Sequence, residues 1–193
     1  MTIPTLEPER KYTYQDYLKW PEEERYELIN GVPYAMSPAP SRKHQEVTGE
    51  LFAEFRNYLR NKDCRAYPAP FDVRLFAENK EDDQVINVIQ PDITVVCDKD
   101  KLDERGCKGT PDLIVEVLSP ATGKQDRWLK YKLYERAGVK EYWIVDPMNE
   151  LVDVFVLNES GKYELIGSYG KDDTVKVGIF DDLTIELNII FRQ

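Results

Sequence analysis

Apolar residues recur every third or fourth position in two segments of the chain, which is the spacing of one buried helix face. In the first segment, Val47 and Leu51 follow Ser41, a residue that favours the N-terminal cap of a helix. The second segment ends before Gly138, a residue type common just past a helix end. A shorter helix is expected after Thr13, another capping residue. We therefore predict helices over residues 14–20, 42–61 and about 125–136.

Runs of β-branched and aromatic residues bounded by turn signals predict strands. Asn30-Gly31 is the dipeptide preferred in two-residue turns, so a hairpin is expected around it. Pro91 interrupts a long apolar run, which indicates an edge position, a bulge or a bend. Strands are predicted within residues 25–38, 64–69, 71–76, 85–98, 112–118, 141–146, 151–157, 162–170, 174–180 and 183–191, with a polar loop over 99–111.

The order of these elements predicts an α/β fold. Strand, helix and strand over residues 112–146 indicate a right-handed parallel crossover, which places the two strands side by side in one sheet. The four late strand runs indicate antiparallel hairpins that extend or cap this sheet. A length of 193 residues suits one domain spanning 1–193.

Composition narrows the class of protein further. Hydrophobic residues make up 41% and charged residues 32%, and no apolar run is long enough to span a bilayer. Residues 1–14 lack the apolar core typical of a signal peptide, so none is expected. Cys64, Cys97 and Cys107 are odd in number and form no CxxC, so we expect neither a disulfide framework nor a cysteine zinc site. A cytoplasmic location is expected. The net charge of -10 argues against a protein that coats nucleic acid through general electrostatics, but not against local binding.

Glu116 stands in the middle of a strand run that is otherwise fit for burial on both faces. A buried carboxylate needs a cation, a donor cluster or a proton, because losing its hydration costs several kcal/mol. A salt bridge or a strand end in water satisfies this need without any function. A metal or catalytic site also satisfies it, but from this run alone the structural interpretation is favoured.

Lys130 falls in the middle of the apolar face of the predicted helix, together with Asp126 one turn earlier. Lys132 instead points outward with Trp128, Glu135 and Arg136 on the charged face. A crossover helix that follows the Glu116 strand brings Lys130 within reach of that carboxylate. The alternatives are that Lys130 pairs with Asp126 or extends its amine to the surface.

Asp92 occupies the same kind of apolar strand setting as Glu116. Two carboxylates that converge in one sheet repel each other unless a proton or a cation lies between them. A hard divalent ion with oxygen ligands, typically Mg²⁺ or Mn²⁺ with water completing its shell, resolves the repulsion. Two acids and a lysine then make a site for metal-dependent phosphodiester hydrolysis.

Gln90-Pro91-Asp92 followed by Glu116 resembles the PD-(D/E)xK nuclease core. The surrounding residues, over most of Tyr26 to Pro147, resemble the Uma-two branch, a restriction-endonuclease-like family common in cyanobacteria. The resemblance implies a restriction-endonuclease-like mixed sheet flanked by helices. It also implies that Asp92 and Glu116 are metal ligands.

By the same resemblance, Glu27 is the acidic residue that precedes the core, and Lys130 is the catalytic lysine. One departure from the pattern is clear, because Leu118 stands two residues after Glu116 where the motif has lysine. In this branch the lysine has moved to the following helix, which agrees with the helical phase of Lys130.

His44 and Asp126 are candidate substrate-binding residues. His44 is the only histidine and lies near the start of the long predicted helix. A surface or capping position is the common one for such a histidine, and the alternative is the mouth of a cleft next to phosphate. Candidates for a basic rim that guides a phosphate backbone are Arg42, Lys43, Lys124, Arg127 and Lys132. For each residue taken alone, scattered surface charge is the favoured interpretation.

The sequence thus predicts a magnesium- or manganese-dependent endonuclease that acts on nucleic acid, with DNA as the expected substrate. The alternative is a non-catalytic module that binds nucleic acid or protein on the same fold, which the acidic composition and the missing in-line lysine favour. A homodimer is expected, because duplex cleavage commonly uses two sites related by a twofold axis. No membrane partner is expected.

Overall fold

The computed structural model describes residues 10–21, 25–36, 40–119 and 124–192, with the side chains of 124–126 left out. Its α-helices are α1 (Tyr14–Tyr17), α2 (Arg42–Tyr58), α3 (Lys124–Ala137) and α4 (Leu187–Ile190), and its 3₁₀ turns are η1 (Asp82–Gln84) and η2 (Lys99–Lys101). Its strands are β1 (Tyr26–Ile29), β2 (Val32–Ala35), β3 (Arg65–Pro68), β4 (Val73–Arg74), β5 (Val88–Ile89), β6 (Ile93–Val96), β7 (Leu102–Asp103), β8 (Gly106–Lys108), β9 (Leu113–Val117), β10 (Glu141–Asp146), β11 (Leu151–Leu157), β12 (Tyr163–Gly170), β13 (Thr174–Lys176) and β14 (Thr184–Glu186).

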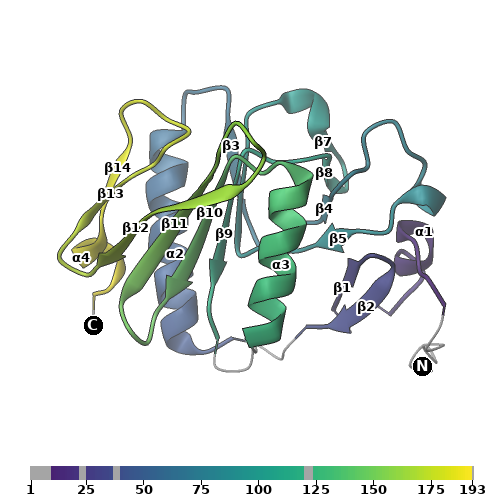
Figure 1. The fold of residues 1–193 in the computed structure, drawn as a ribbon, viewed down its shortest axis with the longest axis horizontal. Coiled ribbons are helices and arrows are strands. Elements are labelled where there is room, and N and C mark those ends of the chain that lie inside the picture. Colours follow the sequence, from purple (N-terminus) through teal and green to yellow (C-terminus); the bar gives the residue numbers. More distant parts are fainter. Residues whose placement is uncertain (1–9, 22–24, 37–39, 120–123, 193) are drawn as a thin grey trace.

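The sheet with the longer strands, called the larger sheet below, has six strands in the order β12-β11-β10-β9-β6-β3 (Figure 1). β9 and β10 pair in parallel, with Glu116 opposite Ile144, and α3 crosses over between them. The neighbouring pairs β10·β11, β11·β12, β6·β9 and β3·β6 are antiparallel. The parallel crossover and the antiparallel extension predicted from the sequence are both present.

A second six-stranded sheet has the order β2-β1-β5-β4-β8-β7, and β13 and β14 form a separate pair. The β1–β2 hairpin turns at Asn30 and Gly31, whose positive φ angles of 52° and 76° explain the choice of this dipeptide. The chain passes from β5 in this sheet to β6 in the larger sheet through Gln90, Pro91 and Asp92. The break predicted at Pro91 is therefore the point where the chain changes sheets.

Alternating side chains of β9 and β10 separate two apolar clusters on opposite faces of the larger sheet. Val115 and Trp143 lie on the face covered by α2, with Leu51 and Phe55. Ile114, Ile144 and Tyr142 lie on the other face, where they cluster with Leu133 and Tyr134 of α3. Since Glu116 follows the alternation of Ile114, its side chain is on the α3 face.

The aromatic residues around α1 pack inward. Thr13 forms a capping box with Asp16 at the start of this helix. Trp20 contacts the rings of Tyr12, Tyr17 and Tyr26, and the group packs on a cluster that includes Leu28 and Val88. The aromatic residues around α1 are therefore part of the packed interior.

Several predicted boundaries and elements are wrong. α1 ends at Tyr17 and α2 at Tyr58, each three residues earlier than expected. The supposed polar loop 99–111 contains a turn of 3₁₀ helix and the β7–β8 hairpin. The last predicted strand continues as helix α4, because Leu187 and Ile190 bury one helical face against the α2 side of the larger sheet.

The expectation of no disulfide is also corrected. Cys64 and Cys97 are joined by a disulfide at the end of the β3·β6 ladder, next to the pair Arg65 and Val96. The two residues are 33 positions apart, so no spacing motif marks them in the sequence. Cys107 is a buried free thiol, and burial raises its pKa to about 12.

Across the described ranges, every helix is too short or too polar to cross a lipid bilayer.

Glu141 at the start of β10 is a buried carboxylate whose hydrogen bonds hold the fold together. Its Oε1 accepts from Trp143 Nε1 at 2.7 Å, and its Oε2 accepts from the Ile179 amide at 2.8 Å. Glu141→Ala leaves the buried Trp143 donor and the half-buried Ile179 amide without their acceptor, so the free energy of unfolding should fall by about 2–5 kcal/mol. Urea denaturation measures the change. Glu159→Ala, at an exposed turn, is the control, and equal midpoints for the two variants would contradict the assignment.

Candidate active site

Glu116 on β9 is the centre of the site. Its side chain is 14% exposed and lies on the sheet face that α3 covers. Its Oε1 accepts hydrogen bonds from Lys130 Nζ at 3.0 Å and from the Tyr134 hydroxyl at 2.5 Å. Both donors come from α3, one turn apart, so a single helix face supplies the compensation that a buried carboxylate needs.

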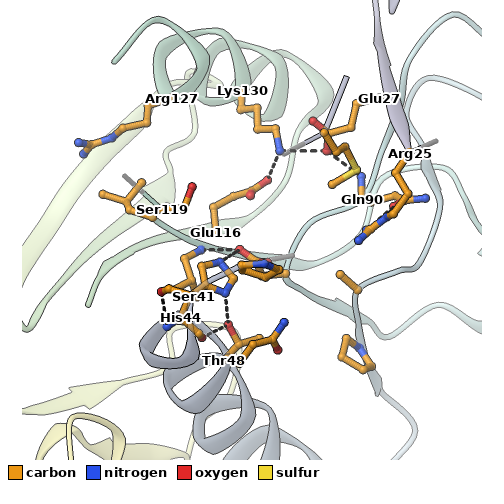
Figure 2. Close-up of a pocket in the computed structure, with 18 of the residues that line it drawn as sticks. Arg25, Glu27, Ser41, His44, Thr48, Gln90, Glu116, Ser119, Arg127 and Lys130 are labelled. Atoms are coloured by element: carbon orange, nitrogen blue, oxygen red, sulfur yellow. Dashed lines mark hydrogen bonds and ion pairs between the residues drawn. The ribbon is translucent and has the colours of Figure 1, made fainter. Parts of the chain in front are cut away.

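Lys130 bridges two carboxylates from different sheets, as Figure 2 shows. Its Nζ lies 3.0 Å from Glu116 Oε1 and 2.9 Å from Glu27 Oε1. Glu27 belongs to β1, and the same oxygen accepts the backbone N–H of Gln90 at 2.9 Å. The predicted inward direction of Lys130 is confirmed, whereas Lys132 points outward as expected, with 46% of its side chain exposed.

The ionisation of the site follows from burial and from these neighbours. Burial raises the pKa of Glu116 to about 7. The charge of Lys130 and the hydrogen bond from Tyr134 lower this pKa, whereas the charges of Asp92 and Glu27 raise it. Burial alone lowers the pKa of Lys130, but Glu116 and Glu27 together raise it well above its usual value. Lys130 is therefore a fixed positive charge at neutral pH.

Asp92 enters the same site from the start of β6. Its Oδ2 accepts the backbone N–H of Val117 at 2.7 Å, which fixes the carboxylate beside Glu116. His44 Nε2 lies 3.4 Å from the same oxygen. Burial lowers the pKa of His44, but the hydrogen bond and charge of Asp92 outweigh it and raise the pKa overall.

His44 corrects the favoured prediction of a surface or capping histidine. The residue is buried, with its ring toward Asp92 and a hydroxyl of Thr48 3.4 Å from Nδ1. The helix cap is instead Ser41, whose hydroxyl accepts the His44 backbone N–H. The cleft position, the alternative weighed from the sequence, is the one that His44 takes.

A cavity of about 570 Å³ connects these groups. Glu27, Asp92, Glu116, Lys130 and His44 all line it. The structure thus brings together five of the six predicted site residues, although their roles stay predictions. The sixth is Asp126, whose side chain lies outside the described residues.

The predicted outward direction of the Glu135 side chain is wrong. It was placed on the outward face of the helix with Trp128, but the structure buries it. Its Oε2 accepts the Tyr163 amide at 3.0 Å, and Lys132 and Lys162 lie 3.2 and 3.3 Å from Oε1. Glu135 is buried because strand β12 packs beside α3 at this position. Helical phase alone does not indicate where that later strand lies.

Three residues of the site were missed. Tyr134 carries a signal in the sequence, because it follows Lys130 by four residues on the same helix face. Gln90 and Arg25 carry none. Gln90 Oε1 accepts from Arg25 Nε at 3.0 Å and from Nη2 at 2.6 Å, a contact across 65 residues that no local pattern indicates.

The donor set fits a hard divalent ion. Asp92 and Glu116 present carboxylates to one cavity, and the charge of Asp92 contributes to the raised pKa of Glu116. A cation shared by the two carboxylates relieves their repulsion. In the described part of the chain, no three His, Cys, Asp or Glu side chains are grouped closely enough to hold an ion by themselves. Two carboxylates with water and substrate oxygens are a usual set of ligands for Mg²⁺.

Comparisons with known proteins agree with this architecture. A solved structure from Anabaena variabilis, described as a "putative nuclease", superposes with a TM-score of 0.72 at 22% identity, covering 93% of this chain and 97% of that one. It shows that the fold is the predicted restriction-endonuclease-like α/β fold. A Synechocystis sp. protein described as uncharacterized is 29% identical over 188 residues, 96% of this chain and 94% of its own length.

A family model named Uma2 and described as "Putative restriction endonuclease" matches residues 14–188. This range includes both sheets, α3 and every residue that lines the cavity. The resemblance seen in the sequence is thereby confirmed, and the chain belongs to the Uma2 family.

Proposed function

We propose that the protein is a metal-dependent endonuclease that hydrolyses phosphodiester bonds of nucleic acid, with DNA as its substrate. The observation that carries the proposal is the position of Lys130. Its charged amine lies 3.0 Å from Glu116 in a cavity that Asp92 also lines. The family and the fold support nuclease activity, and the metal and the substrate are inferred from the chemistry of these side chains.

Asp92 and Glu116 would hold a Mg²⁺ or Mn²⁺ ion. When bound, such an ion polarises a phosphoryl oxygen and makes water more acidic. The chain itself supplies the fixed geometry, because the Val117 amide holds Asp92 and the Tyr134 hydroxyl holds Glu116. Metal binding would also keep Glu116 ionised by opposing the repulsion from Asp92.

Lys130 would stabilise the negative charge that develops at the reacting phosphate. A cation already fixed in position by buried carboxylates needs no reorganisation during the reaction. Glu27 is a positioning residue for this amine, since it accepts a hydrogen bond from Nζ at 2.9 Å and another from the backbone N–H of Gln90. In this proposal Glu27 binds no metal.

A cleavage assay tests the function. Wild-type protein should cut plasmid and linear DNA, and RNA less well, only when Mg²⁺ or Mn²⁺ is present. Glu116→Ala should reduce the rate at least about 100-fold, because it removes a metal ligand and the partner of Lys130. If no metal and no substrate raise turnover above the Glu116→Ala background, the enzyme proposal is wrong. The non-catalytic binding module then remains.

We further expect a homodimer in solution. β12 lies at one edge of the larger sheet, and its Leu165 and Ile166 side chains are 55% and 56% exposed. An exposed edge strand with apolar side chains is a common place for a second chain to pack. Light scattering at micromolar concentrations should give twice the chain mass of 22.5 kDa. A monomeric mass across this range would contradict the expectation.

A further inference from the structure

Two arginines line the cavity without forming an ion pair among the described residues, although Asp146 is close enough to Arg127 to interact with its charge. They are Arg25, just before β1, and Arg127 on α3. Carboxylates are plentiful in this chain, with 36 acidic residues against 26 basic ones. Four other arginines pair with carboxylates, namely Arg10–Asp16, Arg42–Glu46, Arg74–Asp103 and Arg105–Asp82. Arg60, Arg65 and Arg136 donate to uncharged oxygens and lie outside the cavity.

Arg25 is held in place by an uncharged residue. Gln90 Oε1 accepts from both Nε and Nη2 of Arg25, at 3.0 and 2.6 Å. The amide of Gln90 is fixed in turn, because its Nε2 donates to Asp72 at 2.9 Å and lies 3.0 Å from the Tyr17 hydroxyl. A guanidinium has five N–H donors, so three remain for a ligand while the full positive charge is kept.

Arg127 occupies the other side of the site. Figure 2 shows Arg127 and Arg25 on opposite sides of the Lys130–Glu116 pair. Among the residues considered for a basic rim, Arg42, Lys43 and Lys132 are paired with Glu46, Glu150 and Glu135, and none of the three lines the cavity. Among the described residues that line the cavity, the positive charge outside any ion pair therefore lies at two points that flank the proposed catalytic centre.

From this arrangement we infer that Arg25 and Arg127 bind the phosphates on either side of the scissile phosphate. The inference rests on the proposed function and adds to it the shape of the substrate, a nucleic-acid strand that runs across the cavity. Arginine is well suited to this role because its planar donors match phosphate oxygens. Because the two arginines lie on opposite sides of the Lys130–Glu116 pair, a strand that crosses the cavity brings one phosphate to each of them.

Binding of a 12-nucleotide fluorescein-labelled DNA strand, followed by fluorescence anisotropy, tests the inference. Calcium replaces magnesium, and a gel after each titration verifies that the strand is intact. Arg25→Ala and Arg127→Ala should each weaken binding about tenfold. Each should also lower the slope of log affinity against log salt by about 0.7, the value for one phosphate contact on a single strand. The double variant should lose about 1.4.

Arg56→Ala is the matched control, since Arg56 is exposed on α2 and does not line the cavity. Its affinity and slope should equal those of the wild type, and thermal melting should be the same for all variants. Unchanged slopes in both single variants, a double variant no weaker than a single one, or a wild type that does not bind the strand would each overturn the inference. Reduced slopes without cleavage by the wild type would retain the strand-binding site and reject the nuclease function.

Discussion

Lys130→Ala should lower the rate of DNA cleavage by about 10²–10³-fold while its affinity for Mn²⁺ stays close to that of the wild type. Lysine is not a metal ligand, so its loss should appear in the chemical step rather than in metal binding. Cleavage rates at saturating metal and calorimetric titration with Mn²⁺ separate the two effects. Lys132→Ala is the matched control, two residues later on the same helix and half exposed.

Folding must be measured beside activity in this variant. Removing Lys130 leaves Glu27 and Glu116 buried without their shared cation, a change that typically costs about 3–5 kcal/mol. Assays should therefore be run well below the melting temperature of the variant. A folded Lys130→Ala protein with full activity, or an inactive Lys132→Ala protein, would contradict the role of Lys130.

Asp92→Asn should weaken Mn²⁺ binding at least about 100-fold and abolish cleavage, because it removes one of two carboxylates proposed as ligands. Asparagine keeps an oxygen acceptor for the Val117 amide, which Asp92 now binds at 2.7 Å. The fold should therefore be better preserved than in Asp92→Ala, which leaves that amide unpaired at a cost of about 1–3 kcal/mol. Calorimetry with each variant measures the metal affinity directly.

Asp83→Ala serves as the control for this experiment. Asp83 is an exposed carboxylate in η1 and does not line the cavity. Its replacement removes one negative charge from the protein without changing the site. The Mn²⁺ affinity of Asp83→Ala therefore measures the general effect of charge, separate from the loss of a ligand. Equal Mn²⁺ affinity in the wild type and Asp92→Asn would show that Asp92 is not a ligand.

The central pair of this site was predictable because two local periodicities determine it. Strand alternation places Glu116 on the same face as Ile114, and helical phase turns Lys130 toward that face. The parallel crossover then requires the helix to cover the strand. Each step uses only neighbouring residues and a general rule of chain geometry, which is why it could be made from the sequence.

The rest of the site depends on contacts between distant segments. Gln90 interacts with Arg25 across 65 residues and with Tyr17 across 73, and neither contact leaves a trace in any local pattern. Glu135 was placed outward for the same reason, because its burial depends on Tyr163 in a later strand. Cys64 and Cys97 likewise meet only through the pairing of β3 with β6.

The bridge from Glu27 through Lys130 to Glu116 also determines when the proposed site can be completed during synthesis of the chain. Glu27 and Lys130 are 103 residues apart, and they come from the first strand and from the helix between β9 and β10. During synthesis the chain emerges from its N-terminus, so β1 and Glu27 appear long before α3. A nascent chain that ends before α3 contains both proposed metal ligands but no lysine between the carboxylates. Under the proposed function, a fragment that ends before α3 therefore lacks the lysine that cleavage of nucleic acid requires.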